Sequence, residues 1–269
     1  MSAAPLVSVV LPVHDGVAYL GAAIDSILRQ TYPRLELIVI DDGSSDGSAA
    51  LAESYADPRV RVVRNDCNQG IVASLNRGID VARGELIARM DADDVAAPRR
   101  LELQVRRMTE DPELAVLGTD ITYGDAAGAA IGRPRGLPSG PALVRWRLLR
   151  GTCLYHPTVM LRRSALGRER YSAERIHAED YDLWLRLSRR HRLDNLPQHL
   201  LLHRRHGASV SARHLETQLD SAARSLRDHV EECYGLALTP GQARALLDPR
   251  AFLERRGDDA DSPVAAVRE

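Results

Sequence analysis

The stretch LELIVIDDGSSDG, residues 35–47, decides the fold. Its first half is a short run dominated by branched apolar residues, which is typical of a strand buried on both faces of a parallel sheet. Its second half is rich in Asp, Ser and Gly, which suit a tight connection from a strand to a helix. The stretch therefore predicts one βα unit, with a strand over Leu35–Ile40 and a helix over Ser48–Tyr55.

Similar units lie on both sides of this one, between residues 6 and 108. Apolar runs alternate there with segments whose apolar residues recur at helical spacing. Such alternation with short connections predicts an α/β fold with a mostly parallel central sheet flanked by helices. The expected strands are Leu6–Val13, Leu35–Ile40, Val60–Val63 and Glu85–Met90, and the expected helices are Tyr19–Leu28, Ser48–Tyr55, Ile71–Val81 and Pro98–Met108.

The pattern weakens after residue 108. We expect a first domain over residues 1–210 and a helical C-terminal extension over 211–269 whose last dozen residues are frayed. The extension has apolar residues at helical spacing, so it is expected to pack on the domain, on a second subunit of a homodimer or on a membrane surface. Within the domain, the sequence predicts an apolar strand Leu114–Tyr123, a loop Gly124–Gly140, helices Ala142–Leu149 and Tyr181–Arg190, and a strand Leu200–His206.

Composition excludes several classes of protein. The 36 basic and 37 acidic residues nearly cancel, so no strong overall field favours nucleic acid. All 36 basic residues are arginines, which excludes catalysis by lysine. Cys67, Cys153 and Cys233 form no CxxC pair, so neither a disulfide framework nor a zinc site is expected. The thiols instead favour a reducing cytosol.

No segment approaches the roughly 18 apolar residues of a membrane span, and the N-terminus lacks the positive region of a signal peptide. We therefore expect a soluble cytoplasmic protein, which could still work peripherally at the inner face of the membrane.

The acidic string RMDADDV, residues 89–95, follows the fourth expected strand. Three carboxylates this close repel one another unless a cation neutralises them. Oxygen ligands suit Mg²⁺ or Mn²⁺, which proteins commonly hold with one or two carboxylates and substrate phosphates. The string therefore favours a divalent metal site over a solvated acidic loop.

Two other interpretations of this string fit less well. An EF-hand loop starting at Asp91 would place Val95 and Ala96 where an oxygen ligand and a glycine are required. The nucleophile motif of haloacid-dehalogenase phosphatases normally follows the first strand, and that family usually needs a lysine. This chain has the string on the fourth strand and contains no lysine.

Two further acidic positions are candidates for chemistry. Asp42 lies just after the second expected strand, where its carboxylate either accepts a hydrogen bond from a nucleobase or merely caps a turn. Glu179 and Asp180 open an amphipathic helix that carries Leu183 and Trp184. A helix N-terminus stabilises a carboxylate in its charged form, which is also the form that a general base requires.

Taken together, the chain resembles the family 2 inverting glycosyltransferases of the GT-A fold. The resemblance covers about residues 6–211 and depends on an ordered set of motifs, each of which is weak by itself. These motifs are VSVVLPVHDG, LELIVIDDGSSDGS, NQGIVASLNRGIDVARGELIARMDADDVAAPRRLELQ, HPTVMLRRS, AEDYDLWLRL and HRRHGASVS.

The resemblance implies a role for each matching position. Asp42 corresponds to the aspartate that contacts the nucleobase, and Asp180 to the base that deprotonates the acceptor hydroxyl. Asp93 corresponds to the ligand of a divalent metal, with His206 as a second candidate for the metal or diphosphate and His203 and Arg205 as weaker ones. The remaining implied positions are Pro12, Val13, His14, Asp91 and Ala92 in the nucleotide-sugar pocket, and His156 and Glu179 on the acceptor side.

The implied reaction moves a sugar from a nucleoside diphosphate, with a UDP-sugar as the expected donor, to the hydroxyl of a glycan or lipid-linked acceptor. A haloacid-dehalogenase phosphatase and a non-catalytic sugar-nucleotide-binding protein are the alternatives. A Rossmann dehydrogenase is disfavoured because no GxGxxG follows the first strand. For His156 a structural role also stays open.

Overall fold

The computed structural model describes residues 4–205 and 215–248. Its sheet has nine strands in the order β3-β2-β1-β4-β8-β6-β9-β5, and β7 pairs with β6 outside this path. The strands are β1 (Val7–Val13), β2 (Leu35–Asp41), β3 (Val60–Arg64), β4 (Leu86–Arg89), β5 (Val95–Ala96), β6 (Leu114–Gly124), β7 (Ala130–Gly132), β8 (Met160–Arg162) and β9 (Arg192–Arg204).

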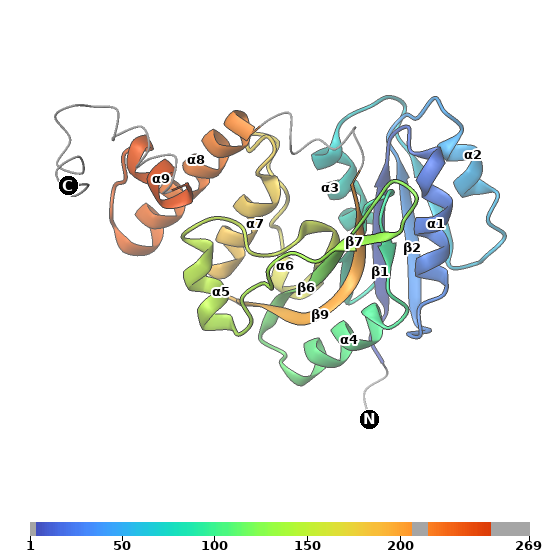
Figure 1. Ribbon diagram of the computed structural model, residues 1–269, viewed down its shortest axis with the longest axis horizontal. Coiled ribbons are helices and arrows are strands. Elements are labelled where there is room, and N and C mark those ends of the chain that lie inside the picture. The colour runs from blue at the N-terminus through green and yellow to red at the C-terminus, as the bar shows by residue number, and fades with distance from the viewer. Residues whose placement is uncertain (1–3, 206–214, 249–269) are drawn as a thin grey trace.

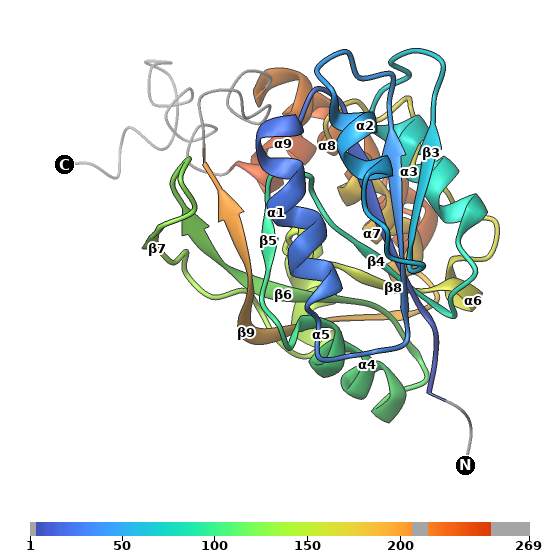
Figure 2. The same cartoon turned by 90° about the vertical axis from the view of Figure 1, so that its right-hand side faces the viewer.

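Helices cover both faces of this sheet (Figures 1 and 2). One hydrophobic cluster lies against α1 and α4, and a second lies against α3, α5, α7 and α8. The helices are α1 (Val17–Leu28), α2 (Ser48–Glu53), α3 (Ile71–Val81), α4 (Arg100–Glu110), α5 (Pro141–Leu148), α6 (Arg163–Leu166), α7 (Glu179–Ser188), α8 (Leu215–Tyr234) and α9 (Pro240–Leu247), with a 3-10 turn at His156–Thr158.

The first half of the chain forms the parallel units that the sequence predicts. β1 pairs in parallel with both β2 and β4, and all seven residues of β1 and of β2 are buried. Gly43 follows β2 with φ of +69°, and a Cβ there would lie 2.6 Å from the carbonyl carbon of Cys67. Glycine is therefore required where this loop approaches the segment that leads to α3.

The second half differs from the prediction in three places. β9 begins at Arg192, eight residues before the expected strand, because Asp194 and Asn195 interrupt the apolar pattern yet are buried with hydrogen-bond partners. β8 lies inside the HPTVMLRRS string, where no strand was expected, and pairs antiparallel with β4 and β6. The predicted loop over residues 124–140 contains β7.

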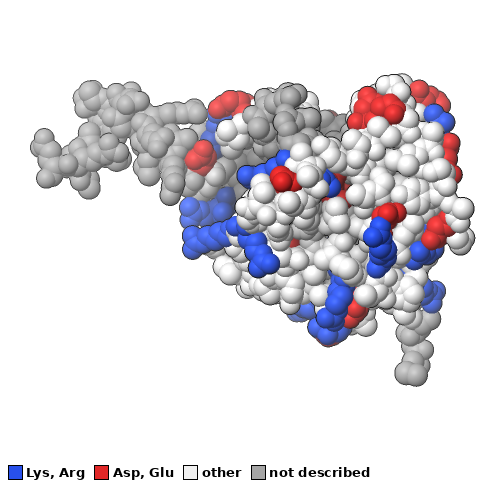
Figure 3. Space-filling view, turned by 45° about the vertical axis from the view of Figure 1, so that its right-hand side comes forward, with Lys and Arg blue, Asp and Glu red and all other residues white. Residues whose placement is uncertain are grey.

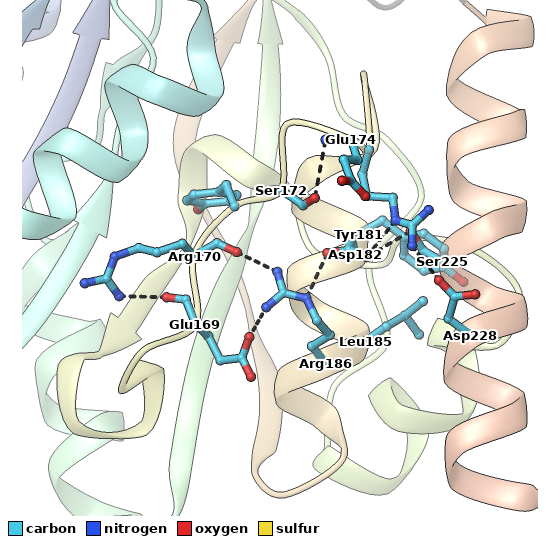
Figure 4. A network of polar contacts seen from close by, with 12 residues as sticks. Glu169, Arg170, Ser172, Glu174, Tyr181, Asp182, Leu185, Arg186, Ser225 and Asp228 are labelled. Atoms are coloured by element: carbon cyan, nitrogen blue, oxygen red, sulfur yellow. Dashed lines mark hydrogen bonds and ion pairs between the residues drawn. The ribbon is translucent and has the colours of Figure 1, made fainter.

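The C-terminal helix α8 packs directly on α7. Leu226 and Val230 of α8 share the hydrophobic cluster of Trp184, whereas Leu215, expected on the same face, is 58% exposed. The packing has a polar centre at the buried carboxylate of Asp182 (Figure 4). Its Oδ1 accepts a hydrogen bond from Ser225 Oγ at 3.1 Å, and Oδ2 accepts one from Arg186 Nε at 2.8 Å.

Candidate active site

The carboxyl ends of β1, β2 and β4 meet at one edge of the sheet, because the three strands are parallel neighbours. The residues after β1 contact those after β2: the Asp42 amide donates to the Val13 carbonyl at 2.8 Å, and His14 Nδ1 lies 2.9 Å from the Asp42 carbonyl. A Cβ on Gly16 would lie 3.8 Å from Cβ of Ala92. The structure therefore brings together the positions expected in the nucleotide-sugar pocket: Pro12, Val13, His14, Asp42, Asp91 and Ala92.

The carboxylate of Asp42 is buried and already accepts three hydrogen bonds. Oδ1 accepts from Asn65 Nδ2 at 2.6 Å and from the Gln69 amide at 3.0 Å, and Oδ2 accepts from the Gly70 amide at 2.9 Å. Each carboxylate oxygen offers two lone pairs, so Oδ2 keeps the capacity to accept one more donor. Asp42 therefore both fixes the start of α3 and retains an acceptor for a ligand.

The adjacent Asp41 is a second candidate that the sequence analysis passed over. Both of its carboxylate oxygens are buried and accept no hydrogen bond within the described residues. Arg64 Nε, at 3.8 Å, forms its ion pair. Asp41 is the last residue of β2 and Asp42 follows it, and the two carboxylates contact different neighbours: Arg64 for Asp41, and Asn65, Gln69 and Gly70 for Asp42.

The carboxylates of Asp91, Asp93 and Asp94 form one cluster, in which oxygen atoms of all three lie within 4.8 Å of one another. Asp94 is fully buried, and its Oδ1 accepts from the Arg204 amide at 3.0 Å and lies 3.1 Å from His203 Nδ1. Asp94 thus holds the end of β9 against the acidic loop. Carboxylate oxygens at this spacing fit a Mg²⁺ or Mn²⁺ ion, with Asp91 and Asp93 on its accessible side.

Crowding in this cluster shifts the protonation of Asp91. Burial raises the pKa of its carboxyl to about 6, and the charges of Asp94 and Asp93 add to the rise while Arg89 opposes it. A divalent cation would relieve this repulsion, because opposite charge favours the ionised form. The donor set and its electrostatics therefore both fit a metal.

Arg89 connects this cluster to the opposite side of the site, and the sequence analysis gave it no role. Its side chain is buried, Nη1 lies 2.5 Å from Asp91 Oδ2, and Nε has no hydrogen-bond partner within the described residues. Its charge acts to lower the pKa of both His156 and Asp180. An arginine inside the otherwise apolar strand LIARM was the sequence signal, since a buried charge requires a partner.

Asp180 lies in the first turn of α7, where its Oδ1 accepts from the Tyr181 amide at 2.6 Å. We expected the helix N-terminus to keep this carboxyl ionised at neutral pH, and that expectation is wrong. Burial, followed by the charge of Glu179, raises the pKa of Asp180 to about 7, against the opposing effect of Arg89. The desolvation of the carboxylate exceeds the stabilisation by the helix end.

This raised pKa predicts that Asp180→Asn stabilises the fold at high pH. In the unfolded chain the carboxyl ionises near pH 3.8, so above the folded pKa of about 7 the native state carries the full cost of a buried charge. At about 1.4 kcal/mol per pKa unit, a rise from 3.8 to about 7 corresponds to at most about 4 kcal/mol. Because the Asp180 side chain is only partly buried, we expect the variant to gain about 1–3 kcal/mol in the free energy of unfolding at pH 8. Urea unfolding at several pH values measures this gain.

The gain should shrink steadily as the pH falls from 7 towards 4. Equal stability of variant and wild type at pH 8 would contradict the raised pKa. Glu179→Gln is the comparison variant: it keeps the carboxyl of Asp180 but removes the second cause of its raised pKa, so its gain at pH 8 should be smaller than that of Asp180→Asn.

His156 packs in an aromatic cluster beside Asp180. Its Nε2 lies 3.0 Å from the hydroxyl of Tyr171, and its ring meets Trp184 edge-on at 6.0 Å between centroids. Burial, together with Arg89, lowers the pKa of His156 well below its ordinary value, so its ring is neutral. These contacts support the structural role that was left open for this histidine.

The end of β9 closes the site over the acidic loop. Arg204 Nε donates to the Asp93 carbonyl at 2.8 Å, and the guanidinium lies 4.7 Å from the centroid of the Tyr19 ring. Arg205, a weaker candidate from the sequence, lies over Tyr123 at 3.9 Å. His206 falls outside the described residues. The sequence gives no signal for Arg204, because its partners Asp93 and Tyr19 are distant in the chain.

Comparisons with known proteins agree with this geometry. The family model described as "Glycosyl transferase family 2" matches residues 8–169. EpsE of Bacillus subtilis (strain 168) is 38% identical over 192 residues, which are 69% of this chain and 68% of EpsE. The O-antigen biosynthesis glycosyltransferase WbnJ of Escherichia coli is 32% identical over 233 residues, 84% of this chain and 90% of WbnJ.

A third relative has a named donor and acceptor. WfgD of Escherichia coli, a UDP-Glc:α-D-GlcNAc-diphosphoundecaprenol β-1,3-glucosyltransferase, is 29% identical over 181 residues, 67% of this chain and 68% of WfgD. The match of the family model ends at residue 169, so it does not reach Asp180.

Two solved structures share the GT-A fold. TarS 1–349 of S. aureus in complex with UDP-GlcNAc aligns with a TM-score of 0.69 at 18% identity, over 98% of this chain and 76% of that one. The mannosyltransferase PcManGT of Pyrobaculum calidifontis, in complex with GDP-Man and Mn²⁺, aligns with a TM-score of 0.66 at 20% identity, over 98% of this chain and 78% of that one.

Proposed function

Because this chain belongs to glycosyl transferase family 2, we propose that it transfers a sugar from a UDP-linked donor to an acceptor hydroxyl with inversion, in the synthesis of a cell-surface polysaccharide or glycoconjugate. The observation that carries the proposal is the arrangement around Arg89. This buried arginine contacts Asp91 of the acidic cluster, and its charge acts on Asp180 on the other side of the site. A diphosphate leaving group and an attacking hydroxyl would thus meet between the two.

We propose that Asp42 contacts the base of the donor, that Asp91 lies towards the ribose, and that Asp93 holds a divalent metal. A bound Mn²⁺ or Mg²⁺ would stabilise the negative charge that develops on the nucleoside diphosphate. Arg89 presents a permanent positive charge beside Asp91, which supports the same stabilisation.

On the acceptor side we propose Asp180 as the general base. Its carboxylate would take the proton of the acceptor hydroxyl while that oxygen attacks the anomeric carbon from the face opposite the leaving group. One displacement breaks the sugar–phosphate bond and inverts the configuration, so no covalent intermediate on the protein is needed. Glu179 raises the pKa of this base and thereby makes it a stronger proton acceptor.

The acceptor is proposed to be a glycan or a lipid-linked glycan, used in the cytoplasm at the inner face of the membrane. The diphosphoundecaprenol-linked acceptor named for WfgD supports this choice. Among the described residues, no helix has both the length and the apolar character needed to cross a membrane.

Family membership removes the phosphatase alternative, and measurable sugar transfer would remove that of a non-catalytic binding protein. The division into a catalytic unit at residues 1–210 and an extension at 211–269 is part of the same proposal.

A thermal-shift screen of nucleoside diphosphates with and without Mn²⁺ tests the proposal. We expect UDP with Mn²⁺ to raise the unfolding temperature most, because a ligand at about 100 times its Kd adds about 2.7 kcal/mol to the free energy of unfolding. UDP in EDTA should have a much smaller effect. A larger shift with ADP or GDP would reject the uridine donor, and no shift with any nucleotide would reject the function.

Asp42→Asn should change the choice between bases. The uracil imide donates a hydrogen bond, whereas the same ring position of cytosine accepts one, so loss of the charged acceptor weakens UDP selectively. We expect the affinity for UDP to fall about 10-fold relative to that for CDP, as measured by calorimetry. An amide oxygen in the place of Oδ1 can still accept the bonds from Asn65 and Gln69, which keeps most of the loop contacts, whereas the Gly70 amide loses its acceptor at Oδ2.

Asp41→Asn is the matched control, one residue away in a buried position. If the ratio of the affinities for UDP and CDP is unchanged in Asp42→Asn but altered in Asp41→Asn, the contact with the base should be assigned to Asp41 instead.

A further inference from the structure

Helix α5 presents an apolar outer face that the rest of the described chain leaves uncovered. Val144 and Leu148 are buried, and Trp146 is two residues from each of them, so it lies on the opposite side of the helix. Trp146 is 55% exposed and Leu143 is 49% exposed. Leu143 and Trp146 are three residues apart and therefore adjoin one another on the helix surface, which makes them one contiguous apolar patch and a candidate interaction surface.

Arginines surround this face. Arg145 and Arg147 flank Trp146 in sequence, and Arg150 lies 5.9 Å from the centroid of its ring. Within the described residues, no acidic side chain forms an ion pair with any of these three. The basic character extends along the sequence, because residues 126–168 contain eight arginines and no acid. Although the whole chain has a net charge of −1, residues 126–168 thus carry only positive charge.

Figure 3 shows a group of basic side chains at the left of the body and the largest group of acidic ones at the upper right, with smaller groups of both signs elsewhere. A cavity of about 540 Å³ adjoins α5, and Arg145, Arg168 and Arg190 contribute to its lining. Glu169 and Glu232 also line it and form ion pairs with Arg186 and Arg189, so the hollow keeps an excess of arginine over acid.

Helix α5 is also connected to the proposed base. The hydroxyl of Tyr181 donates a hydrogen bond to the carbonyl of Leu148, at the end of α5, and Tyr181 directly follows Asp180 on α7. A surface held by α5 would therefore lie at a fixed position relative to the acceptor side of the site.

We propose that α5 docks this protein on an anionic lipid surface, with Trp146 and Leu143 entering the headgroup region and Arg145, Arg147 and Arg150 pairing with lipid phosphates. Tryptophan favours the membrane–water interface, and clusters of arginine bind anionic leaflets. Docking by a second copy through the same face is disfavoured, because a two-fold axis there would place arginines against their own copies. The proposal deepens the lipid-linked acceptor proposed above, but it concerns binding and can fail while the transferase assignment stands.

Intrinsic fluorescence of the full chain tests the docking. The protein has two tryptophans, and Trp184 is fully buried, so a change on adding vesicles reports Trp146. Vesicles of phosphatidylcholine with phosphatidylglycerol should shift the emission to the blue, and brominated chains should quench it. Vesicles of phosphatidylcholine alone should do neither, and salt should weaken the binding.

Sedimentation with the same vesicles compares three variants. Two variants should each bind anionic vesicles at least about 10-fold more weakly than wild type. Arg145→Gln/Arg147→Gln/Arg150→Gln loses the attraction to lipid phosphates, and Leu143→Gln/Trp146→Gln loses the apolar side chains that enter the headgroup region. Arg29→Gln/Arg34→Gln/Arg61→Gln removes equal charge from exposed positions in the N-terminal half and should bind like wild type. An unfolding temperature equal to that of the wild type confirms that each variant is folded. If a variant fails to fold, quenching of the wild-type Trp146 fluorescence by brominated lipid still decides the proposal.

If the control triple variant loses as much vesicle affinity as the α5 triple variant, the binding depends only on the net charge of the protein, and the proposal is overturned. Absence of binding to anionic vesicles would also overturn it. A wild-type dimer that Trp146→Gln converts to a monomer, without vesicle binding, would instead assign α5 to a protein interface.

Discussion

Asp180→Asn is expected to lower kcat by about 10²–10⁴-fold at pH 8 and to leave the KM for the donor nearly unchanged. A positioned general base contributes about this factor, and the proposed position of Asp180 is on the acceptor side, away from the acidic cluster. Asparagine keeps the shape of the side chain and can accept the hydrogen bond from the Tyr181 amide. Steady-state kinetics with the donor varied separates the loss of chemistry from any loss of binding.

The pH dependence gives a second, independent readout. The pKa of Asp180 is about 7, and the base acts only when ionised, so kcat/KM of the wild type should fall as the pH drops through 7. Glu179 is the second cause of the raised pKa. Glu179→Gln should therefore move this fall in kcat/KM to lower pH while most of the activity at pH 8 is kept.

These two variants also test which acid is the base. Neighbouring residues of a helix point about 100° apart, so both are not expected to serve one hydroxyl. Near-normal turnover in Asp180→Asn, combined with inactivity of Glu179→Gln, would move the assignment to Glu179.

Asp93→Asn should abolish the effect of metal on donor binding. The variant retains Asp91 and Asp94, but Asp94 is committed to Arg204 and His203, and Asp91 to Arg89. We expect the affinity for UDP in Mn²⁺ to fall to the level seen in EDTA, and kcat/KM to fall by about 10²–10³-fold. Calorimetric titration of UDP with and without Mn²⁺ measures the first effect, and the transferase assay the second.

Asp220→Asn on α8 is the matched control, since it removes one carboxylate from an exposed ion pair with Arg244. It should leave both measurements unchanged. Full activity of the wild type in excess EDTA would show that no metal is needed.

The first half of the fold was predictable because its strands are short apolar runs separated by turn residues. β1 and β2 begin and end within a residue of the predicted limits, since their neighbours on both faces are supplied by adjacent βα units. The proximity of the candidate site residues at the ends of these strands followed from the same rule. Parallel order alone places Asp42 and Asp91 at one edge of the sheet.

The remaining features depend on contacts between distant segments. β8 has three residues, and it forms only because β4 and β6 pair with it. The pKa of Asp180 depends on burial that no local pattern reveals, so the rule for helix ends gave the wrong direction. The position of Arg89 likewise depends on distant segments, because its charge pairs with Asp91 and also acts on the pKa of His156, which comes from a much later part of the chain.

The contact between Asp182 and Ser225 limits how this enzyme can be recombined with its relatives. A chimera joined at residue 210 would combine α7 from one parent with α8 from another. The buried carboxylate of Asp182 would then keep its bond from Arg186 on α7, but it would lose the bond from Ser225 unless the second parent also has a hydroxyl at that position of α8. Asp182 is two residues from Asp180, so a poorly matched graft would disturb the proposed base without altering any residue of the proposed pocket. Exchange of acceptor specificity should therefore use crossovers after Tyr234, so that both helices come from one parent.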